Sequence, residues 1–463
     1  MNVDALYADP VLDQAPQEVV FLGAGFSRAV SDQFPLTDEL GELAVARAET
    51  DGHGPIPHPV FRDGNFEMWL SRLVEEQPYL DAASNLENQS RFRRLSQAIR
   101  SVLVDRQDAV LGAGPKDWLY DLLSVLHARH ATVVTLNYDN LVECAAESHY
   151  LNDWGAQQRV STEDVLYDIP PSAERPVGMR KYLLASTFRL LKLHGSLSWY
   201  WSPDDTTGMT LQRWKAPGTF GAPVPDNEDQ RRRALPGREP FIVPPSAAKS
   251  AFYANLVTRE LWSQAFSALR HAKRIVLIGY SLPIGDLTVG GMIGDAAANR
   301  DVRFEIINPN PDPVCERLTI LGVDRNQITR IQNGYDCVEH FTRRYLDEQA
   351  RELVDRLRAW PGSLSTRNLE VSWGGQTERR VAHLDNPDPT TNDLLIDPSV
   401  GSELAPCLDL GALLARFPDT KRLVTVAADG RHLPIVDTWI GKIQPGETDP
   451  PWISLIPSGR PAS

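Results

Sequence analysis

The sequence of 463 residues is poor in cysteine. It has four, and none of them stands in a Cys-x-x-Cys pair: Cys144, Cys315, Cys337 and Cys407. Pairs of that spacing are the ligands of zinc ribbons and the redox centres of thioredoxin-like proteins, so the sequence predicts neither class. Such few and scattered cysteines favour reduced thiols, and therefore a cytoplasmic protein.

Long apolar runs and excess positive charge are also absent. No apolar stretch approaches the ~18 residues of a membrane span. Asp4 and Asp9 precede any apolar run, with no basic region before it, so we expect no secretory signal. The formal net charge of −14 predicts no direct nucleic-acid binding and no attraction to a membrane surface. One basic cluster, Arg231–Arg233 with Arg238, is either solvated loop charge or a contact site.

The sequence does contain five apolar runs that are typical of buried strands. They lie at 17–22, 131–136, 189–194, 274–279 and 302–307, and helical patterns lie between them at 117–130, 256–272 and 286–298. Alternation of strands and helices predicts an α/β fold with a parallel, Rossmann-like sheet. At 42% hydrophobic residues, a chain of this length has enough apolar material for more than one core.

Three other regions interrupt or follow this pattern. Apolar residues at helical spacing predict an inserted helical layer at about 66–111, and a stretch rich in Gly and Pro predicts a long surface loop or lid at about 202–240. An amphipathic helix at 341–360 is expected to close a first domain, 1–360. Short alternating runs then predict a β-rich C-terminal appendage, 361–463, including a hairpin around Asp429-Gly430.

The first strand leads into a glycine loop, Gly23-Ala24-Gly25-Phe26-Ser27. Glycines at the first and third positions allow backbone amides to approach a diphosphate, which the N-terminus of the next helix also favours. A plain turn is the alternative. Arg28 occupies the place of the third glycine of the dehydrogenase fingerprint, and no acidic partner for a ribose follows about 20 residues on, which disfavours a dehydrogenase.

The second and third strands end in polar side chains. Thr135-Leu-Asn137-Tyr-Asp139 offers an amide that can both donate to and accept from ribose hydroxyls or a water. Alternatively, Asn137 or Asp139 caps the following helix. His194, followed by Gly195, can serve as a general base for a water or hydroxyl, or can be a structural histidine.

The last two strands end in residues suited to the other half of a dinucleotide. Gly279 and Ser281 provide a glycine and a hydroxyl for a phosphate or ribose, and Asn308 places an amide at the next strand end. Plain loop chemistry is the alternative for both segments. Because ligands of parallel sheets bind outside the carboxyl ends of the strands, the five segments together predict an NAD+ site.

Taken together, the five segments resemble those of the sirtuin family, over roughly residues 15–345. The resemblance implies that Gly23, Ala24, Gly25 and Ser27 cradle NAD+ and that Asn137 and Asp139 face its nicotinamide and ribose. It also implies a role for His194 at the reaction centre and places Gly279, Ser281 and Asn308 near the adenosine half.

Two features depart from the deacetylating sirtuins. The interval between His194 and Gly279 contains no cysteine, where that group has a zinc module, so no zinc is expected. The Gly-Ile-Pro-x-Phe-Arg segment is also replaced. The chain is therefore similar to the zinc-free, sirtuin-like NAD+ hydrolases of bacterial anti-phage systems, which deplete NAD+ after infection is sensed and so cause abortive infection. That resemblance implies a homo-oligomer and a defence partner such as a hexameric ATPase or a short Argonaute.

The expected reaction is cleavage of NAD+ to nicotinamide and ADP-ribose. Asn137 is expected to fix the ribose hydroxyls and the attacking water, His194 to act as base, and Asp139 to accept from the carboxamide. Two rivals stay open. One is NAD-dependent protein deacylation or ADP-ribosyl transfer, and the other is a non-catalytic subunit that senses NAD or ADP-ribose.

Overall fold

The structure is a computed structural model. Besides seven strands between 367 and 454, it describes residues 18–148, 152–153, 158–167, 169–173, 187–203, 205–215, 218–224, 228–246, 250–283, 285–298, 301–331, 334, 336–345 and 348.

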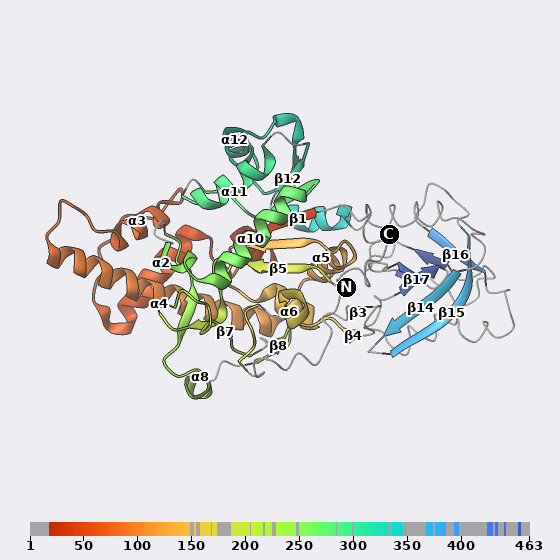
Figure 1. Cartoon of the computed structure of the whole chain (residues 1–463), viewed down its shortest axis with the longest axis horizontal. Helices are drawn as coiled ribbons and strands as arrows, with labels where there is room; N and C mark the ends of the chain where they lie inside the picture. Colours follow the sequence, from red (N-terminus) through yellow and green to blue (C-terminus); the bar gives the residue numbers. More distant parts are fainter. Residues whose placement is uncertain are drawn as a thin grey trace.

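A six-stranded sheet forms the centre of the molecule (Figure 1). Every neighbouring pair is parallel, and the order is β13-β12-β11-β1-β2-β5. The strands are β1 (Glu18–Leu22), β2 (Thr132–Thr135), β5 (Arg189–Lys192), β11 (Arg274–Ile278), β12 (Arg303–Ile307) and β13 (Ile328–Ile331). The predicted α/β, Rossmann-like sheet is confirmed. Strand β13 was not predicted, because this half-exposed edge strand has only four residues and includes Thr and Arg.

The order of the strands determines where a ligand can bind. From β1 the chain builds outward through β2 to β5, then returns to the other side of β1 and continues through β11, β12 and β13. The direction of winding therefore reverses between β1 and β11. In open parallel sheets, the crevice outside the strand ends at such a reversal is the usual ligand site.

Helices cover the sheet, and α10 (Leu256–His271) lies against β1, β2 and β5 (Figure 1). Its apolar residues, including Leu261, Ala265 and Leu269, are buried in the main core, as a helix packed on a sheet requires. The other helices of the domain built on this sheet are α1 (Ala24–Val30), α5 (Asp117–Ala128), α6 (Leu141–Ser148), α7 (Thr162–Leu166), α11 (Leu287–Ala297) and α12 (Asp312–Ile320).

The predicted helical layer is present as α3 (Asn65–Val74) and the 32-residue helix α4 (Ala82–Ala113). Helix α2 (Thr37–Ala48), followed by a π-helical turn (Glu49–His53), joins it and was not predicted. The three helices share a hydrophobic core separate from the main one. Gly41 makes the packing possible, because a Cβ there would lie 2.5 Å from Cδ2 of Phe66.

The segment after His194 is more structured than a long loop. Strand β6 (Gly195–Trp201) pairs with β10 (Glu239–Ile242) and β7 (Gln212–Arg213) in an antiparallel sheet. Residues 202–240, predicted as loop, bury Leu211 and Trp214, which explains why they fold onto β6. The remaining short elements are β3 (Asn152–Asp153), β4 (Gln158–Arg159), β8 (Gly218–Thr219), β9 (Ala222–Pro223), α8 (Glu228–Ala234), the 3-10 turn Arg325–Gln327 and α9 (Ser250–Tyr253).

The C-terminal region contains an antiparallel, seven-stranded sheet, as the alternating runs predict. Its hairpin pairs Ala428 with Arg431 across the Asp-Gly sequence. The strands are β14 (Arg367–Trp373), β15 (Gln376–Asp385), β16 (Asp393–Asp397), β17 (Val424–Ala428), β18 (Arg431–Leu433), β19 (Trp439–Ile440) and β20 (Trp452–Ser454). Of the predicted helix 341–360, residues 341–345 belong to a helix that starts at 337, and residues 346–347 and 349–360 lie outside the described residues.

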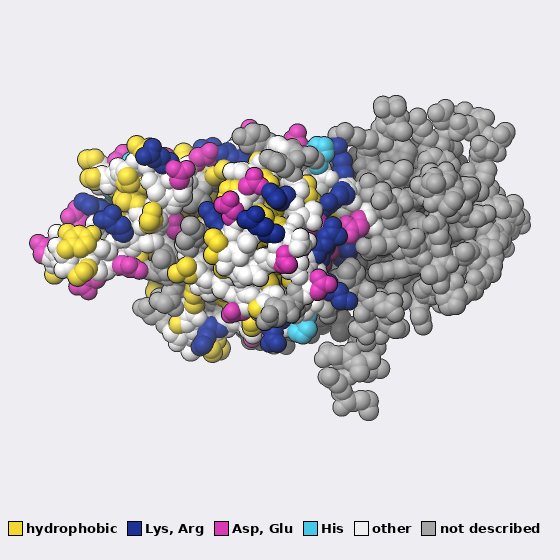
Figure 2. All heavy atoms as spheres, turned by 90° about the horizontal axis from the view of Figure 1, so that it is seen from above, with side chains coloured by type: hydrophobic (Ala, Val, Ile, Leu, Met, Phe, Trp, Pro, Cys, Tyr) yellow, Lys and Arg dark blue, Asp and Glu magenta, His cyan; other side chains and the backbone are white. Residues whose placement is uncertain are grey.

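Figure 2 shows acidic and basic side chains interspersed on one face, and hydrophobic ones gathered at the end that holds α3 and α4. The most exposed apolar side chains of the helical layer are those of Val60, Met68, Tyr79 and Leu86. Within the described ranges, no helix combines the length and the apolar character needed to cross a membrane.

Candidate functional site

The two loops on either side of the reversal point touch through their backbones. The amide of Gly23 donates to the Ile278 carbonyl (3.0 Å), and that of Gly25 donates to the Gly279 carbonyl (2.9 Å). A Cβ on Gly25 would lie 2.8 Å from Cα of Gly279. Gly279 has φ +59°, and a Cβ there would lie 2.2 Å from the Phe26 nitrogen. The glycines thus serve close approach of the loops, and the amides of Gly23 and Gly25 are used within the fold.

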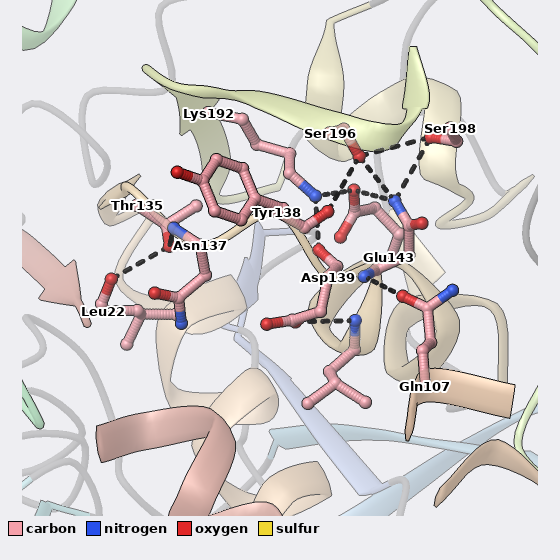
Figure 3. A network of polar contacts seen from close by, with 12 residues as sticks. Leu22, Gln107, Thr135, Asn137, Tyr138, Asp139, Glu143, Lys192, Ser196 and Ser198 are labelled. Atoms are coloured by element: carbon pink, nitrogen blue, oxygen red, sulfur yellow. Dashed lines mark hydrogen bonds and ion pairs between the residues drawn. The ribbon is translucent and has the colours of Figure 1, made fainter. Parts of the chain in front are cut away.

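Asn137 is fastened to the first of these loops. The Thr135 hydroxyl donates to the Leu22 carbonyl (2.9 Å) and accepts from the Asn137 amide (3.0 Å), which fixes the turn after β2 (Figure 3). The side-chain nitrogen of Asn137 donates to the Gly23 carbonyl (2.8 Å) and to the Ser27 hydroxyl (2.9 Å). Both amide hydrogens are therefore engaged. Its Oδ1 accepts no hydrogen bond from the part of the chain that the structure describes.

Asp139 extends the same chain of contacts. Its Oδ2 accepts from the Ser27 hydroxyl (2.7 Å), and its Oδ1 accepts from the amide of Leu141, the first residue of α6 (3.2 Å). The alternative of a helix cap is thus part of what Asp139 does. Burial raises the pKa of this carboxyl above its usual range, although Lys192 and the Ser27 hydrogen bond oppose the shift. Ser27, Asn137 and Asp139, predicted from two separate segments, form one network.

His194 lies at the end of β5, the strand next to β2. Its side chain is buried, its Nε2 lies 3.2 Å from the Tyr253 hydroxyl, and its ring centroid lies 6.3 Å from that of Trp262. Gly195 is required beside it, because its φ is +81° and a Cβ would lie 2.1 Å from the Phe241 carbonyl oxygen. The turn is closed by the Val243 amide, which donates to the His194 carbonyl (2.9 Å).

Tyrosines from three different segments surround this region. The Tyr280 hydroxyl donates to Asp286 (3.2 Å), and the Tyr138 hydroxyl donates to the Val243 carbonyl (2.5 Å). Burial raises the pKa of Tyr138, Tyr253 and Tyr280, and the carboxylates of Asp286 and Glu67 add to the effect. The three phenols therefore stay protonated, as hydrogen-bond donors, at neutral pH.

Two predicted residues are not drawn into this network. Ser281 is exposed, and its carbonyl accepts from Arg317. Asn308 is half-buried, and its side chain accepts from the Asn310 amide (2.9 Å), which is an ordinary loop contact. Both residues follow strands of the sheet, β11 and β12, at the same carboxyl edge as the others.

A buried charged network lies directly behind the Asn137–Asp139 turn and was missed from the sequence (Figure 3). The Lys192 ammonium pairs with Glu143 (2.8 Å) and donates to the Asp139 carbonyl. The Asn140 side chain donates to Glu143 (3.0 Å) and Ser196 (2.8 Å). Lone charges within the apolar runs 190–193 and 141–146 were a usable signal, because a buried charge is tolerated only when paired.

The described residues hold no group of three or more His, Cys, Asp or Glu side chains that could bind a metal ion.

No protein-family model and no curated protein matches the chain. Solved structures to which it is similar include Sir2 proteins. One, from work on the mechanism and regulation of Sir2 enzymes, is 14% identical, with a TM-score of 0.32 over 78% of this chain and 100% of the other. A complex of Sir2 with a p53 peptide and NAD+ is 13% identical (TM-score 0.29; 73% and 95% covered). A mutant Sir2 homologue with ADP-ribose is 13% identical (TM-score 0.32; 76% and 99% covered).

Proposed function

We propose that this chain is an NAD+ hydrolase that cleaves NAD+ to nicotinamide and ADP-ribose. The observation that carries the proposal is the double contact of Asn137 with Gly23 and Ser27. It joins the turn after β2 to the glycine loop after β1, beside the point where the strand order reverses. A dinucleotide bound at this reversal would meet both loops, and polar groups already oriented there would not need to reorganise.

The chemistry assigned to Asn137 follows from its hydrogen bonds. Its amide hydrogens are held by the Gly23 carbonyl and the Ser27 hydroxyl, so the side chain has a fixed orientation. Its Oδ1 can accept from a ribose hydroxyl or from the attacking water. Holding a water in the right position beside the reacting carbon can lower the activation barrier by roughly several kcal/mol.

The other proposed roles concern charge. Nicotinamide leaves as a neutral amide while the ribose gains oxocarbenium character, so the leaving group needs no proton. His194 is proposed to take the proton of the water or of a ribose hydroxyl. A carboxylate has about four acceptor positions, of which Asp139 uses two on Ser27 and Leu141, so Asp139 can still accept from the carboxamide. Ser281 and Asn308 are proposed to face the adenosine half.

The proposal extends to a role that the motif resemblance implies. We propose that the protein depletes NAD+ as an effector of bacterial anti-phage defence, in a homo-oligomer or with a partner protein of the defence system. Residues 361–463 are proposed to form an appendage for assembly or regulation. Removing 361–463 is expected to change the assembly state, measured by light scattering, or the basal rate; if both stay the same, this part of the proposal is wrong.

The test is to incubate the full chain with NAD+ and quantify NAD+, nicotinamide and ADP-ribose by mass spectrometry. Wild type is expected to produce nicotinamide and ADP-ribose in equal amounts, while Asn137→Ala and His194→Ala fold but lose about 10²–10³-fold in rate. Release of O-acyl-ADP-ribose from an acylated peptide would indicate a deacylase instead. Tight NAD+ binding without nicotinamide, also in the presence of the neighbouring gene products, would indicate a sensor.

A further inference from the structure

We infer that Gln107 is a positioning residue for the Asn137–Asp139 turn, and that through it helix α4 couples the helical layer to the site. This inference rests on the proposed function, which it deepens by naming what holds the reacting loop in place.

Helix α4 is the one element of the helical layer that continues into the main core. Along its length Leu95, Ile99 and Leu103 pack with α2 and α3, whereas Val110 and Leu111 belong to the core of the central sheet. Gln107 lies at the point where the helix passes from one core to the other. Because one continuous helix packs in both cores, it offers a rigid physical connection between the helical layer and the central sheet.

Gln107 contacts the turn directly at this point. Its side-chain oxygen accepts from the backbone amide of Asn140 (2.6 Å), the residue that follows Asp139 (Figure 3). Gln107 is 8% exposed and Asn140 is 2% exposed, so water does not readily replace this bond. Asn140 also binds Glu143 and Ser196 through its side chain, which places it between the helical layer and the charged network behind Asp139.

Tyr138 gives the helical layer a second hold on the same turn. Its half-buried ring packs against the core formed by α2, α3 and α4, together with Leu197 of β6. The Leu197 amide donates to the Tyr138 carbonyl (2.9 Å). Residues 138 and 140 are therefore both held from the helical layer, while Asn137 and Asp139, which alternate with them, contact Ser27.

A hydrogen-bond acceptor is needed at position 107 for this role, and bulk alone does not suffice. Methionine has nearly the volume of glutamine but leaves the buried Asn140 amide without an acceptor, whereas glutamate retains an oxygen at the same reach. The rate of the reaction is more sensitive than substrate binding to displacements of a fraction of an ångström in the reacting groups. Loss of the Gln107 hydrogen bond should therefore lower kcat and leave KM nearly unchanged. Gln97, exposed on the same helix, provides a matched control.

The experiment compares the full chain with Gln107→Met, Gln107→Asn, Gln107→Glu and Gln97→Met. We expect Gln107→Met to lower kcat for nicotinamide release about tenfold or more, with KM changed by less than about threefold. Gln107→Asn, which remains polar but is too short, should lower kcat as well. Gln107→Glu keeps an acceptor oxygen but adds a buried carboxyl close to Glu143, so it should lower kcat less than Gln107→Met does. Gln97→Met should match wild type. Equal kcat values for Gln107→Met and Gln97→Met would overturn the inference.

Hydrogen exchange of the peptide that covers 136–142 gives a readout that does not depend on turnover. Exchange is expected to be at least about tenfold faster in Gln107→Met than in wild type and unchanged in Gln97→Met. Unchanged exchange in Gln107→Met would refute the inference even if the protein hydrolyses NAD+. If exchange is faster in Gln107→Met but the wild-type protein releases no nicotinamide, the role of Gln107 in holding the turn stands and the proposed function is wrong.

Discussion

The two ends of the central sheet both bury polar groups, but they use them differently. At and near the amino ends of the strands, Arg274 pairs with Glu18 (3.3 Å) and Glu305 (3.0 Å), and Arg129 also reaches Glu18 (3.4 Å). The guanidinium carbons of Arg129 and Arg274 lie 4.9 and 5.0 Å from the centroid of the Tyr345 ring. At this edge, buried arginines and buried glutamates form ion pairs with one another.

At the carboxyl ends, the contacts between loops are mostly made by uncharged donors. Ser27 and Asn137 join two turns, and the Oδ1 of Asn137 accepts no hydrogen bond within the described residues. Buried charges that pair with one another destabilise the fold when one partner is removed, whereas an oriented, open acceptor on a half-buried side chain can bind a ligand. The comparison predicts that removing a paired charge at the amino edge lowers stability, and that removing a polar side chain of the network at the carboxyl edge lowers activity more than stability.

The largest effect is expected at the amino edge. Arg274→Met leaves Glu18 and Glu305 buried with less compensation, and should lower the free energy of unfolding by about 3–5 kcal/mol. Arg303→Met is the matched control, because Arg303 pairs with the same Glu305 (3.2 Å) but its side chain is 59% exposed, and it should cost less than about 1 kcal/mol. Chemical denaturation measures both. Equal costs for the two variants would contradict the account, as would a lower NAD+ turnover per folded Arg274→Met molecule.

A smaller effect is expected where the two loops touch. Gly279→Ala should lower the free energy of unfolding by about 1–3 kcal/mol, because its Cβ meets backbone atoms of the first loop and its φ is positive. Gly291→Ala, in helix α11 with nothing within 4 Å of the added Cβ, should instead raise it by about 0.5–1 kcal/mol. Thermal unfolding of the two variants checks the difference. A Gly279→Ala variant as stable as wild type would mean that the loops are not in contact.

At the carboxyl edge, Ser27→Ala should separate activity from stability. The variant removes the hydroxyl that joins Asn137 to Asp139, and should lower nicotinamide release about tenfold while costing only about 1 kcal/mol of stability. Ser31→Ala is the control. Ser31 directly follows the C-terminal residue of α1, and the variant should retain full activity. Turnover and melting temperature are measured on the same preparations. If the Ser27 variant turns over normally, the network is not part of the reaction site.

The buried carboxyls of Glu305, in the amino-edge charge network, and of Asp139, at the carboxyl edge, should also differ in the sign of their pH dependence. Burial opposes ionisation of Glu305, but Arg274 and Arg344 lower its pKa below the usual 4.5, so its contribution to stability is present above that value and lost at lower pH. Burial raises the pKa of Asp139 above 3.8, so its contribution is present below 3.8 and lost as pH rises through the raised value.

Denaturation of wild type, Glu305→Gln and Asp139→Asn across pH tests this difference. The advantage of wild type over Glu305→Gln should shrink as pH falls below 4.5, by about 1.4 kcal/mol for each unit of pKa shift. Its advantage over Asp139→Asn should shrink as pH rises above 3.8. Glu87→Gln, whose side chain is 63% exposed, should show neither trend. The same sign for both variants would exclude the account.

Much of the fold could be predicted because its signals are local. The five predicted strands of the central sheet, β1, β2, β5, β11 and β12, are apolar runs followed by glycine or polar residues, and the pattern of α3 and α4 repeats at helical spacing. Strand β13 and helix α2 were missed because their sequences mix polar and apolar residues, and packing rather than pattern fixes them.

The site could be predicted only in part, for a physical reason. Each of Ser27, Asn137, Asp139 and His194 ends or follows a strand, and the carboxyl ends of parallel strands meet at one edge, so sequence order implies proximity. Gln107 and Glu143 lie within helices, and Lys192 ends the apolar strand β5. Their partners are 33–53 residues away in the sequence, and only tertiary packing brings them together.

The most direct test of the central claim is a crystal structure of the full chain with ADP-ribose or a non-hydrolysable NAD+ analogue. We expect the pyrophosphate at the reversal between β1 and β11 and a hydroxyl of the ribose next to nicotinamide within about 3 Å of Asn137 Oδ1, a normal hydrogen-bond length. The imidazole of His194 should lie next to the same ribose, within reach of its hydroxyls or of the attacking water. A nucleotide bound away from this edge, with the Asn137 oxygen still open, would contradict the account.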